Sequence, residues 1–244
     1  FGLEPGTTRG DIRGCLERWD QGDNMILDYS KAYMLRPGTG WLVGPGILHA
    51  PGSLVSYEPQ WGSDVFGMYQ SLVEGRTVPW ELLVKDMPKD KHQDLDFIID
   101  TIDWDSNTDT NFKDNHFLAP IPVADTESEG YIDKWVTYGS VNGEQLFSSK
   151  ELTIMPGAKV TLKDNAASSI IVNQGRGRIG SLALECPAMI RFGEMTEDEV
   201  FISAKAASEG VEIENTAGSS PLVLLRYFGP NAHSDMPEPG DHKK

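Results

Sequence analysis

One histidine and a row of polar side chains follow a turn near residue 45, and they have the types and spacing of a small-ligand site. His49 lies in the stretch from Gly44 to Gly52, and Ser56, Glu58 and Gln60 follow it at every second position. The Gly-Pro pair predicts a chain reversal, and the alternation predicts a strand with the three polar side chains on one face. Imidazole can bind a metal ion, and a carboxylate can move a proton. Polar groups that face the interior of a barrel are costly unless they bind something, so we expect a pocket here.

The composition limits the partners of such a site. The chain has 244 residues, enough for one large or two small β domains. Its formal net charge of −16 repels phosphate backbones and anionic lipid surfaces, so we expect neither nucleic acid nor a membrane as a partner. The two cysteines, Cys15 and Cys186, follow no metal or redox spacing. We expect free, buried thiols in a reducing compartment, hence a cytoplasmic protein, with one disulfide as the alternative.

Sequence periodicity predicts an all-β dominated chain with a few short helices. A capping-box pattern over Thr8–Asp11 and apolar residues at helical spacing predict a helix over about residues 8–20. Residues 25–78 have a strand-like pattern, and apolar positions from Leu95 to Ile102 form one face of a second helix. Short strands return after residue 131, which favours a jelly roll. We expect these strands at residues 135–138, 151–154, 159–162, 169–173, 188–192, 199–202, 211–215 and 222–227.

Within its first 65 residues the chain resembles the type I phosphomannose isomerase family of metal-dependent cupins. The likeness runs through Leu35–Gly40, Gly46–Ala50 and Tyr57–Val65, where the family carries a Pro-Gly pair, a turn with a His-Ala pair, a glutamate and a Ser-Asp pair. Beyond residue 65 it is a likeness of fold only. The resemblance implies two cupin jelly-roll barrels, the first of them incomplete within this chain. It also implies an aldose-ketose isomerase that uses zinc or another divalent metal on a sugar or sugar phosphate.

The resemblance further implies an order of domains. Residues 1–79 would be the C-terminal part of a catalytic-type cupin domain in a longer protein. Residues 80–130 would connect it to a second cupin-like jelly roll over 131–228, which a flexible tail over 229–244 follows. His49 would be one zinc ligand, and the other ligands would lie upstream of Phe1, in an N-terminal segment that is then a partner of this chain. The second domain has no histidine between Ser140 and Pro230, so we expect it to bind no metal and to buttress the first.

The remaining site residues follow from the resemblance and from one departure from it. The family has an arginine five residues after its serine, and counting from Ser63 places Met68 there. A thioether cannot replace a guanidinium, but Arg76 could do so if the turn over residues 70–75 folds back. We therefore expect Glu58 and Arg76 to be catalytic, and Ser56, Gln60, Asp64 and Met68 to contact the substrate. The plainer alternatives are a hydrogen-bonded strand histidine at 49, surface charges at 58 and 76, a structural Asp64 and a core Met68.

Two other functions remain open beside the isomerase. The absent arginine and the single histidine favour a carbohydrate-binding or regulatory cupin that has lost catalysis. A structural module that acts through protein contacts would instead show an apolar patch over the barrel mouth. His49 separates these hypotheses, because a ring turned outward to water argues against the enzymatic interpretation.

Overall fold

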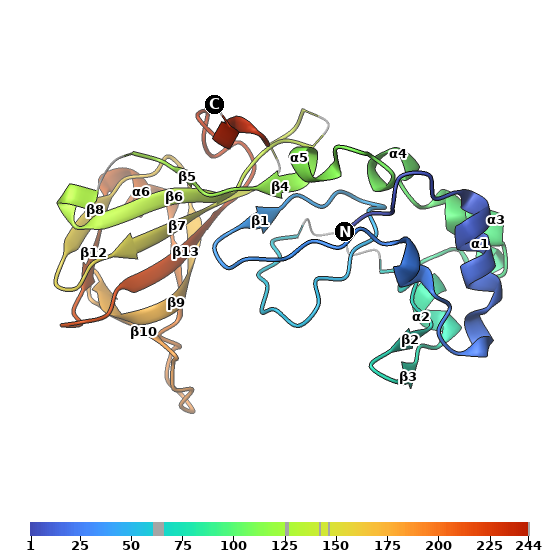
Figure 1. Cartoon of the computed structure of the whole chain (residues 1–244). Helices are drawn as coiled ribbons and strands as arrows, with labels where there is room; N and C mark the ends of the chain where they lie inside the picture. The colour runs from blue at the N-terminus through green and yellow to red at the C-terminus, as the bar shows by residue number, and fades with distance from the viewer. Residues whose placement is uncertain (61–65, 125–126, 142, 146, 244) are drawn as a thin grey trace. The chain divides into compact units, whose positions relative to one another are not determined.

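A computed structural model describes residues 1–60, 66–124, 127–141, 143–145 and 147–243 of the chain. Contacts between residues divide it into two compact units (Figure 1). Unit 1 contains residues 1–36 and 43–115, and unit 2 contains residues 37–42 and the chain from residue 116 onward. Each unit has a hydrophobic core of its own. The domain boundaries that we predicted at residues 79, 130 and 228 stay predictions. Within the described ranges, no helix is long and apolar enough to cross a membrane.

Unit 1 consists of short helices and loops around one apolar core. Its helices are α1 (Arg9–Glu17), α2 (Trp80–Val84), α3 (Leu95–Asp100), α4 (Trp104–Asn107) and α5 (Phe112–His116), which ends at the border of unit 2. Short 3-10 helices span Trp19–Gln21, Ile26–Tyr29 and Lys89–Lys91. The strands β2 (Leu72–Val73) and β3 (Arg76–Thr77) form a hairpin.

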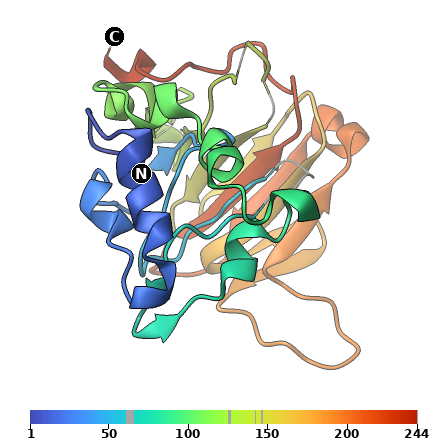
Figure 2. The same ribbon diagram turned by 90° about the vertical axis from the view of Figure 1, so that its right-hand side faces the viewer.

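The first predicted helix is confirmed as α1. The Thr8 side chain accepts a hydrogen bond from the Asp11 amide, and the Asp11 carboxylate accepts one from the Thr8 amide. This reciprocal pair satisfies amides that the start of a helix leaves without an intrahelical partner. Ile12, Cys15 and Leu16 on one face of α1 are buried in the core of unit 1. α3 packs beside α1 (Figure 2).

Unit 2 is built on a nine-stranded antiparallel sheet that curls on itself (Figure 1). The strand order is β5-β6-β7-β13-β9-β12-β8, and β10 and β11 also pair with β9. The strands are β5 (Ile121–Pro122), β6 (Tyr131–Thr137), β7 (Ser148–Ile154), β8 (Lys159–Leu162), β9 (Ser168–Ile179), β10 (Leu182–Cys186), β11 (Glu199–Ile202), β12 (Val211–Asn215) and β13 (Leu222–Phe228). A separate ladder joins β1 (Gly40–Trp41) to β4 (Phe117–Leu118), and α6 (Ala204–Glu209) follows β11. Short 3-10 helices span Glu127–Glu129 and Asp241–Lys243.

The sheet can curl on itself because the two ends of the long strand β9 pair with different strands. Residues 168–171 pair with β11 and β13, whereas residues 177–179 pair with β10 and β12. Two glycines permit the change of partners. A Cβ on Gly175 would lie 2.4 Å from the carbonyl oxygen of Pro221, and one on Gly177 would lie 2.4 Å from that of Glu214. Only glycine lets the neighbouring backbones come this close.

Alternate strand residues fill the inside of the roll. The core of unit 2 contains aliphatic side chains from β7, β9, β12 and β13, such as Leu152, Val172 and Leu224. The predicted fold class, a β-dominated chain with a jelly roll and few short helices, is confirmed. The strand predicted over residues 188–192 is wrong, because this stretch is a loop whose Ile190 and Phe192 are fully exposed and have no sheet face to cover. The sequence patterns missed β10 and α6.

The strand predicted to carry Ser56, Glu58 and Gln60 on one face is also wrong. The described stretch from residue 43 to residue 60 contains no strand, and Val55 is fully exposed. A strand needs a neighbour to pair its amide and carbonyl groups, and no described strand pairs with this stretch.

The segment after β13, for which we predicted a flexible tail, carries two buried side chains. His233 and Met236 are 7% and 8% exposed. Met236 packs with Leu118, Trp135 and Tyr138 in a small core of unit 2. This segment therefore has its own anchoring points on the barrel.

Candidate functional site

The structure places His49 at the surface of unit 1. The residue is exposed, and its Nδ1 lies 2.9 Å from the carbonyl oxygen of Ile47. Its ring stacks on Phe1, with ring centroids 6.4 Å apart and planes at 10°. An outward histidine contradicts the barrel interior that we expected around it.

The polar row after His49 is only partly brought together. The Ser56 hydroxyl donates to Glu58 Oε1 at 3.1 Å. Both residues and Gln60 are exposed in a stretch without a strand, so alternation does not give them a common face. Asp64 lies outside the described residues.

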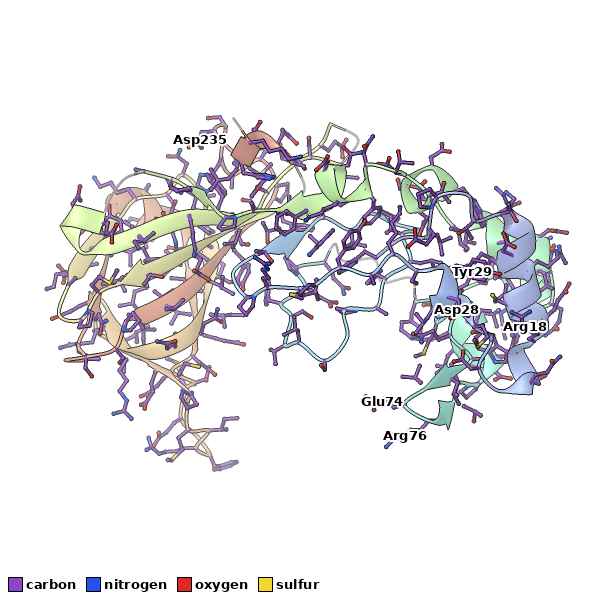
Figure 3. All side chains as sticks on the ribbon, in the orientation of Figure 1. Arg18, Asp28, Tyr29, Glu74, Arg76 and Asp235 are labelled. Carbon is purple, nitrogen blue, oxygen red and sulfur yellow. The ribbon has the colours of Figure 1, made fainter. Side chains whose placement is uncertain are left out.

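Met68 and Arg76 lie in different environments, the first partly buried and the second exposed. Met68 packs partly buried against the core of unit 1, which agrees with its plainer interpretation as a core residue. Arg76 is exposed in β3, directly after a turn in which Glu74 and Gly75 have positive φ angles of 48° and 76°. Figure 3 shows Arg76 projecting outward from this hairpin. The turn does reverse the chain, but it leaves the guanidinium at the surface.

The described part of the chain does not fit a zinc ion. It contains no cluster of three or more histidine, cysteine, aspartate or glutamate side chains that could hold a metal. Zinc takes four ligands, at least three of them from protein in most sites, and His49 supplies one. Both cysteines are free thiols, Cys15 buried and Cys186 partly buried.

A cluster of buried charged side chains lies instead inside unit 2. Five titratable side chains meet at one end of the barrel, and each side chain is at least 90% buried. They come from β6, β7, the β8–β9 connection, β13 and the segment after β13. We call them the buried charge cluster: Asp133, Lys150, Asp164, Arg226 and His233.

Arg226 is the centre of this cluster. Its two terminal nitrogens donate to Asp133 Oδ2 at 2.5 Å and to Asp164 Oδ2 at 2.7 Å. Asp164 also faces Lys150 Nζ at 3.7 Å and His233 Nε2 at 3.9 Å. Two carboxylates thus balance two cations, as buried charges require.

Aromatic rings enclose the two remaining members. Lys150 Nζ lies 4.4 Å from the centre of the Trp135 ring and 5.5 Å from that of Phe228. His233 meets the same two rings edge-on, with centroids 5.2 Å and 4.5 Å away. The ammonium therefore gains cation–π attraction in place of water.

Several polar atoms of the cluster have no protein partner. Arg226 Nε, Asp133 Oδ1 and His233 Nε2 are buried and find no hydrogen-bond partner among the described residues. Burial lowers the pKa of Lys150, with the neighbouring Arg226 charge as a second cause. Burial also lowers the pKa of His233, and Lys150 adds to this effect. Buried polar atoms without protein partners are the usual sign of an ordered water or a ligand group.

A cavity of about 480 Å³ lies at this end of the barrel. Its walls come from the start of β9, from Phe201 of β11 and from the chain around the end of β13, and they comprise Ala166, Ala167, Ser168, Ser169, Phe201, Tyr227, Phe228, Gly229, Pro230 and Ala232. Ser168 also borders a smaller inner space of about 10 Å³, beside Asp164 and Arg226. That inner space has room for about one water-sized group. Phe228 and Ser168 thus connect the cavity to the buried charge cluster.

Two members of this cluster, Lys150 and Arg226, could be recognised as inward residues from the sequence pattern. Lys150 precedes Leu152 and Ile154 at alternate positions, and Arg226 follows Leu222 and Leu224 in the same way. The period of two therefore places both cations on the inner face of their strands. Asp164 and His233 come from a connection and from the chain end, where no periodicity marks an inward side chain.

Comparison with known proteins finds partial likenesses to solved structures at low identity. No family model and no curated protein matches the chain. An RmlC-like cupin from Ralstonia eutropha JMP134 matches 50% of this chain over 66% of its own length, at 13% identity and a TM-score of 0.33. A cupin-2 domain from Rhodospirillum rubrum matches 50% of the chain over 76% of its own, at 14% identity and a TM-score of 0.32.

A third solved structure is oxalate decarboxylase from Bacillus subtilis, a protein with Mn(II) centres. It matches 48% of this chain over 29% of its own length, at 16% identity and a TM-score of 0.31. The chain thus spans less than two thirds of the Ralstonia protein and less than one third of the decarboxylase. The first two are described as cupins, and none of the three is described as a phosphomannose isomerase.

Proposed function

We propose that this chain is a carbohydrate-binding cupin whose ligand, a sugar or sugar phosphate, enters the cavity at the charged end of the unit 2 barrel. The observation that carries the proposal is the cavity of about 480 Å³ backed by buried polar atoms without protein partners. Small-molecule sites in proteins commonly have this size and combine apolar walls with a few polar groups.

The walls suit a molecule with hydroxyl groups on an otherwise apolar ring. Tyr227 and Phe228 offer aromatic surface, and Ser168 and Ser169 offer hydroxyls that can both donate and accept. The Ser168 hydroxyl has no protein partner among the described residues, so a ligand can use it without breaking an existing bond. A hydroxyl that reaches the inner space would lie beside Arg226, whose Nε has no hydrogen-bond partner among the described residues, and an apolar ligand cannot satisfy that donor.

Isothermal titration with unmodified monosaccharides and with their phosphates tests this proposal. We expect saturable binding that Ser168→Ala weakens about five- to tenfold, the effect of losing one hydrogen bond of about 1 kcal/mol. Ser181→Ala is the matched control, because Ser181 is exposed in the turn between β9 and β10. Equal affinities of the two variants, or no heat with any sugar, would contradict the proposal.

A second candidate function is a metal-dependent sugar isomerase at His49, with Glu58 and Arg76 catalytic and Gln60 and Asp64 at the substrate. One observation favours it. A histidine whose Nδ1 donates to a backbone carbonyl, as His49 does to Ile47, keeps Nε2 available for a metal ion, whose other ligands would have to come from outside the described residues.

Metal analysis and an aldose-ketose interconversion assay separate the two functions. If the chain is an isomerase, it should bind a divalent metal and convert the sugar. His49→Gln should then lose the metal, and Glu58→Gln should lose the turnover. Sugar binding without turnover, and without metal at His49, is the result expected for the carbohydrate-binding cupin.

A further inference from the structure

The segment after β13 contributes to the cavity wall and also to the buried charge cluster. Gly229, Pro230 and Ala232 form part of the cavity wall. The next residue, His233, is buried in the charge cluster, and Met236 is buried three residues later. Because His233 directly follows a wall residue, the position of its ring fixes the position of that wall.

Charges of both signs face His233. Lys150 of β7 and Arg226 of β13 oppose a positive charge on the ring, whereas Asp164 after β8 and Asp235 of its own segment favour one. Asp133 of β6 belongs to the same cluster, but its carboxylate accepts from Arg226. Figure 3 labels Asp235, which is exposed and therefore well solvated.

The two carboxylates favour a positive charge on His233 less strongly than its other surroundings oppose one. Asp164 already accepts a 2.7 Å bond from Arg226, and its Oδ1 is 3.9 Å from His233 Nε2, beyond hydrogen-bond distance. The Trp135 and Phe228 rings exclude water from the imidazole. A neutral ring fits these surroundings, and an imidazolium would be a third cation beside Lys150 and Arg226.

We propose that His233 is a pH-sensitive latch, which holds the segment 229–243 against the barrel while its ring is neutral and releases it when the ring gains a proton. The proposal rests on the function proposed above in one respect only, namely that loss of this wall weakens ligand binding. The release itself is a property of the free protein.

The direction of the pH effect follows from the burial of the ring. Burial holds the pKa of His233 below its ordinary value of 6.5. A released ring in water takes up a proton first, so acidification below about pH 6.5 shifts the equilibrium towards the released segment. At neutral pH and above, the seated segment keeps its full stability.

Hydrogen-deuterium exchange of the full chain at pH 7.5 and pH 5.0, expressed as protection factors, tests the latch without any ligand. We expect the hydrogen-bonded amides that depend on the seated segment, those of Ser140, Glu238 and Asp241, to lose about tenfold or more of their protection at pH 5.0 in the wild-type protein, and to keep it in His233→Phe. His233→Gln, which also cannot gain a charge, replaces the phenylalanine variant if that variant does not fold. His242→Gln is the matched control, since His242 is exposed in the same segment, and it should behave as the wild type does.

Unchanged wild-type protection, or an equal loss in His233→Phe, would overturn the latch. Sugar titrations at the two pH values then test its link to binding. Release at pH 5.0 together with a failure to bind any sugar at either pH would leave the latch standing and refute the proposed function. Binding that does not weaken at pH 5.0, despite release, would refute the link between them.

Discussion

Lys150 and Arg226 lie directly opposite each other in the ladder between β7 and β13, so two cations share one row of the barrel interior. Like charges in directly opposite positions destabilise a sheet. Asp164 lies near both, 2.7 Å from Arg226 and 3.7 Å from Lys150, and Asp133 lies 2.5 Å from Arg226. The pairing of the two strands thus depends on carboxylates supplied by other parts of the chain.

Arg226→Met should destabilise unit 2 strongly. The change removes the guanidinium that donates to both buried carboxylates, and breaking a buried ion pair from one side costs about 3–5 kcal/mol. Chemical denaturation followed by circular dichroism measures this loss. The matched control is Arg176→Gln, which removes an exposed pair with Glu185 and should cost less than about 1 kcal/mol. Similar losses in both variants would show that the cluster is not the support that we describe.

Lys150→Met should raise the pKa of His233. Burial of the ring is the main cause that lowers this pKa and the Lys150 charge is the next, and methionine keeps most of the side-chain volume without the charge. Titration of the His233 ring protons by nuclear magnetic resonance measures the shift. Lys159→Met, which removes an exposed lysine paired with Glu212, should leave the His233 titration where it is. A pKa that falls, or that moves equally in both variants, would contradict the proximity of Lys150 and His233.

Tyr138 should ionise late when the folded protein is titrated with base. Burial raises its pKa to about 12 from an ordinary value of 10.0, and its hydroxyl donates to the Ala119 carbonyl oxygen at 2.6 Å. The unfolded chain loses this proton first, so the free energy of unfolding should decrease as the pH rises above about 10. Near-ultraviolet absorbance should show a tyrosine transition near pH 12 that Tyr138→Phe removes and Tyr57→Phe keeps.

The loop between β10 and β11 should contribute to self-association and little to stability. Met189, Ile190, Phe192 and Met195 are between 71% and 108% exposed, an unusual group of large apolar side chains on one surface loop. Phe192→Ser should change the free energy of unfolding by less than about 0.5 kcal/mol. Light scattering at increasing concentration should show weaker association of this variant than of the wild type. A large loss of stability would instead indicate that the loop packs against the protein.

Local signals in the sequence predicted the elements that depend on local physics. The capping pattern at Thr8 and Asp11 marks the start of α1, and the alternation of Leu222 and Leu224 marks the inner face of β13. Both follow from backbone geometry within a few residues. The same alternation misled us at Ser56 and Glu58, since a strand also needs a partner, and the sequence does not show whether one is available.

The site was harder to predict because its members come from five separate parts of unit 2. Resemblance to a known family directed attention to His49, which the structure places at the surface. Asp164 and His233 become inward residues only after the roll has closed, so no pattern within a short window marks them. Lys150 and Arg226 could have been found, because a charged residue in phase with buried leucines is an exception that calls for a partner.

The course of β9 has a consequence for how unit 2 loses its structure. β9 is one continuous strand that pairs with both faces of the roll. It lies first between β11 and β13 and then between β10 and β12. Loss of the ordered conformation of β9 would remove a pairing partner from both faces at once. Unit 2 should therefore lose its structure in one cooperative transition.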